Sequence, residues 1–186
     1  MQYLKDVVRT RIINAAIAEF KEYGYSNASI RNIAEVANIS LGNIYRYYEN
    51  KEDLFLTIIN PLTEMTKQPS VSKVLEDDVS LEATIEIILS YINNHIDEYK
   101  IIRISNTAHF SYFFDRLCDL IARKLEQVLN QKRPLYVKSI VNRNFFNIIS
   151  TGYLNAVLGI IDADNDPQIT QKYIAEISNY YFKDII

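Results

Sequence analysis

Residues 29–55, SIRNIAEVANISLGNIYRYYENKEDLF, decide the fold of the N-terminal part of this chain. Apolar residues recur from Ile30 to Ala37 with the i, i+3, i+4, i+7 spacing of a short amphipathic helix. Ser29 is a suitable N-cap for that helix, and Asn38 tolerates the left-handed conformation that ends one. The stretch therefore predicts a short helix followed at once by a tight turn.

A very short third helix is predicted after this turn. Ser40 is a second N-cap candidate, Ile39 is expected to fill the core beneath the turn, and Ile44 to complete the inner face. Ala34 is small, as close crossing of the two helices requires. The spacing fits a helix-turn-helix over about residues 30–49.

A longer helix is expected on each side of this motif. The first runs from about Lys5 to Tyr23 and is ended by Gly24, which adopts a left-handed conformation readily. The other runs from Lys51 to about Met65 after a capping-box-like start.

Regular helical patterns continue through the rest of the chain. Only four glycines and four prolines occur in 186 residues, which favours long helices over many turns. We expect an all-α protein of about nine helices, with a head over residues 1–55 and a larger body over residues 56–186. A loop is predicted at about 69–80, and the later helices at about 81–100, 101–108, 111–130, 136–161 and 167–183.

The bulk composition limits the classes of protein that fit. Nearly half of the residues are apolar, so a core needs no disulfide, and the single Cys118 cannot form an internal one. No apolar run follows the first residues, and the most apolar stretch, 145–161, is interrupted by polar residues. A soluble cytoplasmic protein without a membrane span is expected.

Net charge gives no support to nucleic-acid binding. The chain carries a formal charge of −3, and residues 1–56 contain seven basic and seven acidic side chains. Any DNA-binding surface must therefore depend on where individual side chains point.

Catalysis and metal binding have little basis in this sequence. His95 and His109 have no neighbours at metal-ligand spacing, Cys118 lies on an apolar stripe, and no glycine-rich phosphate loop occurs. We expect neither an enzyme nor a bound cofactor or metal.

The segment ISLGNIYRYYENKEDLF at 39–55 resembles the signature of the tetracycline-repressor (TetR) family of transcriptional regulators. The upstream residues Ala16, Phe20, Gly24 and Tyr25 also fall at positions typical of that family. Leu41 and the pair Tyr47-Tyr48 depart from its usual residues, which bears on base preference. The resemblance implies a helix-turn-helix head that binds a DNA operator, and an all-helical body that senses a small molecule.

The resemblance also implies which residues meet DNA. Tyr45, Tyr47 and Lys51 would hold phosphates, with the backbone at Ser40 and Leu41, while Asn43 and Arg46 would face base edges. The full predicted set is Arg31, Ser40, Leu41, Gly42, Asn43, Tyr45, Arg46, Tyr47 and Lys51. Tyr48 is expected to lie in the core. For two residues of the set a structural role is the alternative: Arg46 as a solvated charge, and Lys51 as the ion-pair partner of Glu49 or Glu52.

Dimerisation is expected because two heads on a palindrome give a specificity that one head lacks. TetR-like proteins pair their last two long helices between subunits, which implies an interface at Ile148, Gly152, Ala156, Tyr173, Ile177 and Tyr180. The alternative is that the small residues of this set let helices of one chain pack closely.

An aromatic cluster between head and C-terminal helices predicts an effector pocket. Its candidate lining is Tyr91, His95, His109, Phe110, Phe113 and Phe114, and the alternative is ordinary core packing.

The sequence therefore predicts a homodimeric repressor that an unidentified small molecule releases from a palindromic operator in double-stranded DNA. One alternative is a helical ligand-binding or protein-interaction module with a degenerate head that does not bind DNA. An activator, or a regulator without a ligand, is another.

Overall fold

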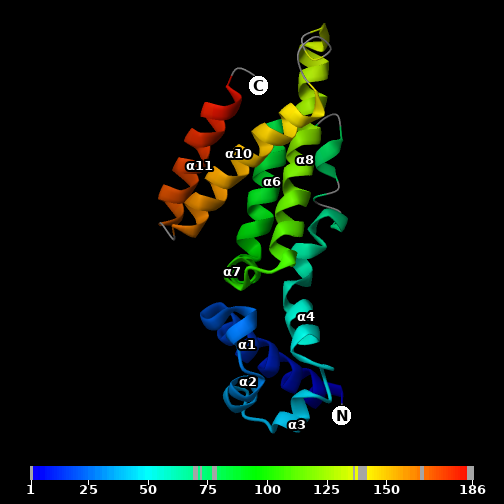
Figure 1. Cartoon of the computed structure of the whole chain (residues 1–186), viewed down its shortest axis with the longest axis vertical. Helices are drawn as coiled ribbons and strands as arrows, with labels where there is room; N and C mark the ends of the chain where they lie inside the picture. Colours follow the sequence, from blue (N-terminus) through cyan, green and yellow to red (C-terminus); the bar gives the residue numbers. More distant parts are fainter. Residues whose placement is uncertain are drawn as a thin grey trace. The chain divides into compact units, whose positions relative to one another are not determined.

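Helices account for all regular structure in the part of the chain that the computed structural model describes: residues 2–68, 71, 73–76, 79–135, 137, 142–163 and 166–183 (Figure 1). Nine α-helices and two short 3-10 helices, Met65–Lys67 and Lys73–Leu75, lie in these ranges, and no strand does. The predicted all-α class is confirmed. The chain divides into two compact units, residues 1–67 with 90–113, and residues 68–89 with 114–186.

The first helix of unit 1, α1 (Gln2–Asn27), continues past the predicted stop but breaks at Gly24. Gly24 has φ 68° and ψ 174°, a combination that side-chain-bearing residues rarely adopt. A Cβ atom at this position would also lie 3.3 Å from the carbonyl oxygen of Ile104. The backbone amide of Tyr25 donates to Ser105 Oγ at 3.0 Å directly after the break. Glycine therefore lets α1 lie close to the end of a later helix.

Three helices follow, each beginning directly after the residue expected to precede it, and two of these residues cap through their side chains. Helix α2 (Ile30–Val36) begins at Ser29, whose hydroxyl accepts from the Asn32 amide at 3.4 Å, and α3 spans Leu41–Ile44. Helix α4 (Lys51–Thr63) begins at Asn50, whose side chain accepts from the Asp53 amide at 2.9 Å. The predicted starts of these helices are confirmed.

Helix α7 (Ile96–Ser105) packs against both α1 and α4 and completes unit 1. The Lys21 ammonium pairs with Asp97 at 2.5 Å, and the Tyr91 hydroxyl donates to the carbonyl oxygen of Pro61 on α4 at 2.8 Å. The core of this unit includes Phe20 and Phe55, whose rings meet edge to face at 5.3 Å. Residues far along the chain are thus part of the same compact unit as the helix-turn-helix.

The predicted helix over 81–100 is divided in the structure. Helix α6 (Leu81–Asn94) ends before His95, whose φ of −124° and ψ of 38° are not helical, and α7 begins at Ile96. The Tyr91 and His95 rings lie 4.6 Å apart across this break. Asparagine and histidine have low helix propensity, which favours a break here.

Unit 2 contains most of α8 (Ala108–Lys132), together with α10 (Arg143–Asp162) and α11 (Pro167–Phe182). The two last helices pack together through Tyr153, which lies 4.8 Å from the ring of Phe182 and hydrogen-bonds Ser178 Oγ at 2.9 Å. Helix α10 begins later than the predicted 136, because Asn142 caps it by accepting from the Phe145 amide at 3.2 Å. Part of the expected first turns, 138–141, lies outside the described residues.

Residues Asn144–Asp162 of α10 are long and apolar enough to cross a membrane by length and composition alone. Only 33% of that stretch is buried inside the protein. A helix of a soluble protein can pass the same test, so composition does not establish a membrane span.

Candidate DNA-binding surface

The turn between α2 and α3 is built as the sequence predicts. Asn38 has a φ of 53°, in the left-handed region that asparagine tolerates better than most residues. The amide of Asn38 donates to Glu35 O and that of Ile39 to Ala34 O, each at 3.0 Å. These hydrogen bonds pair two carbonyl oxygens at the C-terminal end of α2. The chain then turns toward α3.

Helix α3 has four residues and continues into a turn at 45–47. Ile44 and Tyr48 are buried inside, at 1% and 2% exposure, whereas Tyr45 is 50% exposed. The amide of Tyr47 donates to Ile44 O at 2.9 Å and continues the helical path for part of a turn. The expected core position of Tyr48 is confirmed.

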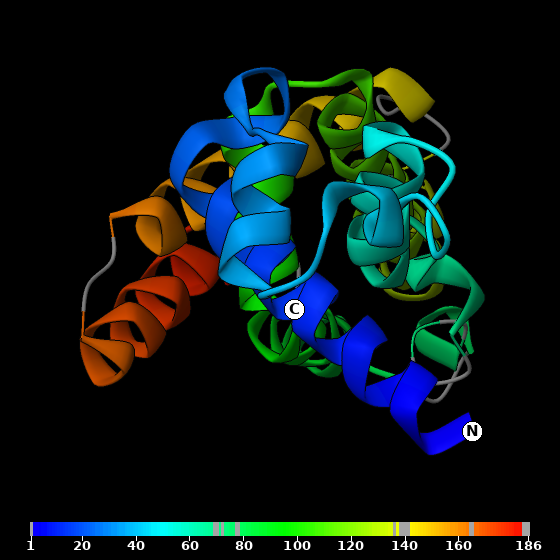
Figure 2. The ribbon, with the colours of Figure 1, turned by 90° about the horizontal axis from the view of Figure 1, so that it is seen from below.

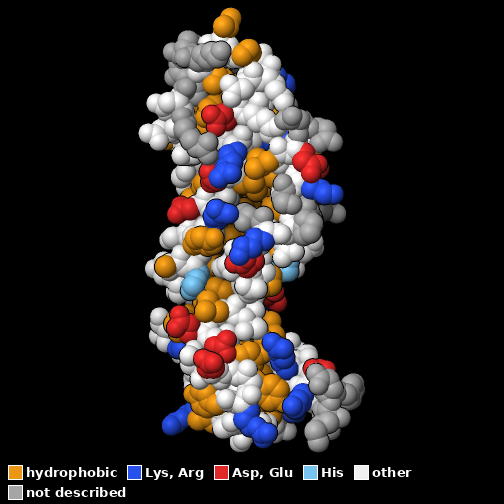
Figure 3. Space-filling view, turned by 90° about the vertical axis from the view of Figure 1, so that its right-hand side faces the viewer, with side chains coloured by type: hydrophobic (Ala, Val, Ile, Leu, Met, Phe, Trp, Pro, Cys, Tyr) orange, Lys and Arg blue, Asp and Glu red, His pale blue; other side chains and the backbone are white. Residues whose placement is uncertain are grey.

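Every residue of the predicted DNA-contact set remains at least partly open to solvent. Five are exposed and four are half-buried. The exposed residues are Arg31, Ser40, Gly42, Tyr45 and Arg46, and the half-buried ones are Leu41, Asn43, Tyr47 and Lys51. Figure 2 views the head from below, the end at which Figure 1 labels α3, and Figure 3 shows Lys and Arg side chains along the lower edge of the head.

Lys51 makes contacts within the head that the sequence did not suggest. Its ammonium donates to the carbonyl oxygens of Ser26 at 3.3 Å and Ala28 at 3.1 Å, and lies 4.8 Å from the ring centroid of Tyr25. These contacts tie the start of α4 to the last turn of α1 and to the residue that follows this helix. An ammonium group has three N–H donors, so this role leaves one for another acceptor.

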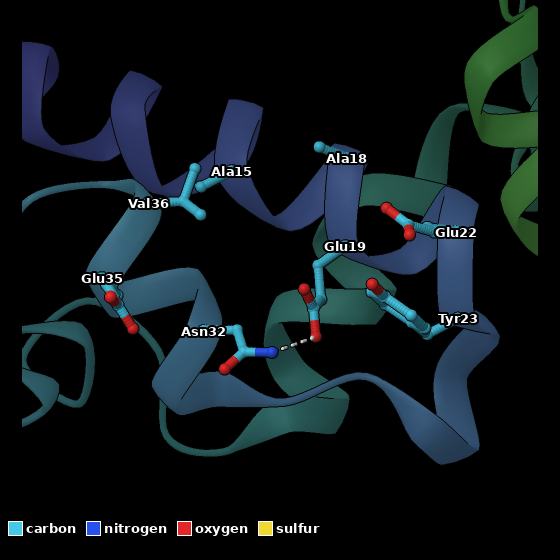
Figure 4. A pocket seen from close by; sticks show the side chains of 8 residues that line it. All are labelled: Ala15, Ala18, Glu19, Glu22, Tyr23, Asn32, Glu35 and Val36. Carbon is cyan, nitrogen blue, oxygen red and sulfur yellow. Dashed lines mark hydrogen bonds between the residues drawn. The ribbon is translucent and has the colours of Figure 1, made fainter.

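A hollow of about 300 Å³ lies between α1 and α2 and is rich in carboxylates (Figure 4). Glu19, Glu22 and Glu35 line it, together with polar and apolar side chains and no basic residue. Three of the seven acidic residues of the head are thus gathered on one surface, which a phosphate backbone would avoid. The balanced charge of the head conceals this segregation.

Glu19 has a positioning role that sequence reasoning missed. It is 9% exposed, and its Oε1 accepts from the Ser29 amide at 2.8 Å and from Asn32 Nδ2 at 3.4 Å. It therefore fixes the start of α2 on α1 (Figure 4). The available signal was a glutamate beside Phe20 in the predicted inner stripe of the first helix.

Arg9 is a second residue that sequence reasoning missed. Its Nε donates to the Tyr48 hydroxyl at 3.4 Å, and this hydrogen bond raises the pKa of the guanidinium above its ordinary value. The contact ties α1 to the segment directly after α3.

The predicted effector residues are not gathered around one described cavity. The Tyr91 and His95 rings contact each other at a tilt of 41°, the His109 ring lies 6.1 Å from that of Phe55, and the Arg103 guanidinium lies 4.8 Å from the Phe110 ring. Phe113 is buried and belongs to unit 1, whereas Phe114 is half-buried and belongs to unit 2. None of the six lines the hollow between α1 and α2, or a second hollow on α10.

The residues of the predicted dimer interface differ in their exposure to solvent. Ile148, Tyr173 and Tyr180 are 69%, 48% and 78% exposed, and Ala156 and Ile177 are half-buried. Gly152 already contacts its own chain, since a Cβ there would lie 3.1 Å from the Tyr181 hydroxyl oxygen. For Gly152, close packing within one chain is therefore what the structure shows.

No group of three or more His, Cys, Asp or Glu side chains within the described ranges could hold a metal ion. Cys118 is buried, and burial raises the pKa of its thiol, which disfavours the reactive thiolate.

Comparison with known proteins gives one consistent result. Residues 12–58 match the model of bacterial regulatory proteins of the tetR family. The chain is 27% identical over 124 residues to the HTH-type transcriptional regulator TtgR of Pseudomonas putida, covering 66% of this chain and 59% of TtgR. It is 34% identical over 73 residues to a probable acrEF/envCD operon repressor of Escherichia coli, covering 39% of this chain and 30% of that protein.

The fold of the whole chain agrees with these matches. A TetR-like transcriptional regulator from a Rhodococcus species superposes with a TM-score of 0.69 at 18% identity, covering 96% of this chain and 95% of that one. The matched region is less than two thirds of the length of either curated relative. Residues 12–58 therefore form a domain of the tetR family of bacterial regulatory proteins, and the whole chain has the fold of a TetR-like regulator.

Proposed function

We propose that this protein is a DNA-binding transcriptional regulator, a homodimeric repressor that a small molecule releases from a palindromic operator in the cytoplasm. The observation that supports it best is the helix-turn-helix, whose left-handed Asn38 turn presents α3 with Tyr45 and Arg46 in solvent. The match of residues 12–58 to the tetR family supports the same conclusion.

The roles proposed on DNA follow from side-chain chemistry and exposure. Asn43 and Arg46 contact base edges, because amide and guanidinium groups form paired hydrogen bonds with adenine and guanine. Tyr45 and Tyr47 donate to phosphates, and Arg31 reaches the flanking backbone. Gly42 lets the DNA backbone approach, since nothing lies within 4 Å of a Cβ placed there.

Lys51 contacts a DNA phosphate through its third N–H group, because the other two donate to the carbonyl oxygens of Ser26 and Ala28. We predict that Lys51→Ala weakens binding to all operators alike and lowers the slope of log K against log salt by about one. Lys21→Ala is the matched control, because Lys21 pairs with Asp97 instead. An unchanged slope in Lys51→Ala would restrict Lys51 to its structural role.

In the proposed mechanism, the conformational change that releases DNA takes place within unit 1. Helix α4 follows the helix-turn-helix and also accepts the Tyr91 hydrogen bond at Pro61, and α7 packs against α1 and α4. An effector that prefers a different arrangement of α6 and α7 would therefore move the head. Tenfold weaker DNA binding requires about 1.4 kcal/mol of coupling.

The test begins with selection of bound duplexes from a random pool by the purified chain. A palindromic consensus, bound with strong salt dependence, is the expected result. Arg46→Ala should relax the base preference at one position of each half-site, whereas Glu82→Ala, on the exposed side of α6, should leave it unchanged. Failure to enrich any sequence, with the chain folded, would overturn the proposal and leave a helical module with a degenerate head.

Small molecules are then screened for release of the selected duplex. Substitutions at Tyr91 and His109 should change the dose needed for release. A duplex that no compound releases would remove the effector from the proposal and retain the DNA-binding role.

A further inference from the structure

The Tyr48 hydroxyl has no part in the DNA contacts proposed above, although Tyr48 belongs to the Tyr47-Tyr48 pair that departs from the usual residues of the tetR family. The Tyr48 side chain is buried, and its backbone amide donates to Ile44 O at 3.1 Å. The phenol is therefore fixed to the turn that directly follows α3. Its hydroxyl oxygen accepts a hydrogen bond from Arg9 Nε on α1 at 3.4 Å.

The two partners of this hydrogen bond differ in how firmly they are held. Tyr48 lies in the core, where close packing restricts an aromatic ring to one rotamer. Arg9 is exposed, and a long exposed side chain samples many rotamers, so ordering it costs conformational entropy. The rigid phenol therefore positions the flexible guanidinium, and not the reverse.

The Arg9 guanidinium has donors for a second acceptor. It has five N–H groups, and the Tyr48 hydroxyl accepts from one of them. Asp6, three residues earlier on α1, and Asp53 on α4 attract its charge. Neither forms an ion pair with Arg9, and no other carboxylate within the described ranges does so. Asp53 accepts instead from the Glu49 amide at 3.0 Å.

Arg9 belongs to the end of unit 1 that presents the predicted DNA contacts. Figure 1 shows the start of α1 at the same end of the unit as α3, and Figure 2 shows both from below. Tyr47, to which we assign a phosphate contact, directly precedes Tyr48. Arginine binds phosphate oxygens through paired N–H donors. A duplex in contact with α3 therefore brings a suitable acceptor to the side of the head on which Arg9 lies.

We infer that Arg9 contacts a phosphate of the operator from outside the helix-turn-helix, and that the Tyr48 hydroxyl positions its guanidinium for this contact. This inference rests on the proposed DNA-binding function and adds two residues to it. A side chain that is ordered before binding loses less entropy on binding, so a positioned arginine binds more tightly than a mobile one. The contact carries no base information, because it meets only the DNA backbone.

Arg9→Gln tests the phosphate contact on the duplex that the unaltered chain selects. Loss of one contact should lower the slope of log K against log salt by about one for each bound head, and weaken binding to all sequences alike. Arg11→Gln is the matched control, since it removes the same charge from an exposed position of α1 that lies about 200° around the helix axis from Arg9. Its slope should equal that of the unaltered chain.

Tyr48→Phe tests the positioning role, because it removes the hydroxyl and keeps the ring in the core. We expect operator binding to weaken about three- to tenfold, as the loss of one hydrogen bond allows, with an unchanged salt slope. In the Arg9→Gln background the same substitution should change affinity by about twofold at most, since the hydroxyl acts through Arg9. A hydroxyl with a merely structural role would give the same loss in both backgrounds.

The outcomes separate this inference from the proposed function. A folded chain that selects no duplex overturns both. A selected duplex with an unchanged slope in Arg9→Gln, or with a slope lowered equally in Arg9→Gln and Arg11→Gln, overturns the phosphate contact alone. Equal losses from Tyr48→Phe in the two backgrounds, or no loss in either, overturn the positioning role. Helical circular dichroism and urea melts of each variant check that the fold persists.

Discussion

At the scale of single residues, two left-handed positions shape the head for different reasons. Asn38 adopts φ 53° in a tight turn that accommodates its side chain. Gly24 adopts φ 68° at a place where the backbone of Ile104 lies too close for a side chain to fit easily. The sequence predicted both positions, because Gly and Asn at the end of an apolar pattern are typical helix stops. It could not predict that Gly24 faces Ile104, eighty residues later.

Gly24→Ala is expected to destabilise the protein by about 1–3 kcal/mol, because alanine would be strained at φ 68° and its Cβ would crowd the Ile104 carbonyl. Gly42→Ala is the matched control, since nothing lies within 4 Å of its Cβ and helical alanine is favoured by about 1 kcal/mol. Urea denaturation measures both. Equal stability of the two variants would contradict the role given to Gly24.

At the scale of elements, α3 is too short to be stable alone. Four residues fall well below the length at which isolated helices persist, so its form depends on buried Ile44 and on the chain around it. The sequence predicted its position from Ser40 and Ile44. After Ile44 the chain continues as a turn, and Tyr48 reaches the core.

The two cap candidates of the helix-turn-helix should differ in their contribution to stability. Ser29→Ala is expected to cost about 1 kcal/mol, because its hydroxyl accepts from the Asn32 amide. Ser40→Ala should cost less, since the Ser40 side chain makes no cap hydrogen bond. Thermal and urea melts of both variants check this order, and a larger loss in Ser40→Ala would refute it.

The pair α10 and α11 should lose stability in strong alkali through Tyr153. Burial raises the pKa of this phenol from 10.0 to about 12. Between these values the unfolded chain releases the proton while the folded chain keeps it, so stability falls as pH rises from 10 toward 12. The fall is on the order of 2 kcal/mol.

Tyr153→Phe removes this titration. At neutral pH it should cost about 1 kcal/mol, because the hydrogen bond to Ser178 is lost. Urea melts at pH 9 and pH 11 should show the gap between the two proteins narrowing as pH rises. A constant gap would show that Tyr153 titrates normally.

At the scale of the whole molecule, the helix-turn-helix belongs to a unit that the sequence did not delimit. The sequence suggested a head ending at residue 55, and that functional boundary stays a prediction. The compact unit around the head comprises residues 1–67 and 90–113, joined by α7 packing on α1 and α4.

A fragment of residues 1–67 is therefore expected to lose cooperative folding. Without α7, the backbone amide of Tyr25 loses its Ser105 acceptor, and apolar surface of α1 and α4 is exposed to water. Circular dichroism should show reduced helicity and a broad melt in the fragment, against a sharp transition in the full chain. A sharp transition in the fragment would show that the head folds alone.

The sequence by itself determined the all-α class, the starts of α2, α3 and α4, the tight turn and the resemblance of the head to the tetR family, because caps, left-handed residues and helical periodicity act over a few neighbouring residues. Asn38 and Ser29 are examples of such local control. Only the tertiary structure decided that Lys51 binds the carbonyls of Ser26 and Ala28, that acidic residues gather beside α2, and that Gly152 meets Tyr181. These contacts join residues distant in sequence, and their geometry depends on how whole helices pack, which no local pattern specifies.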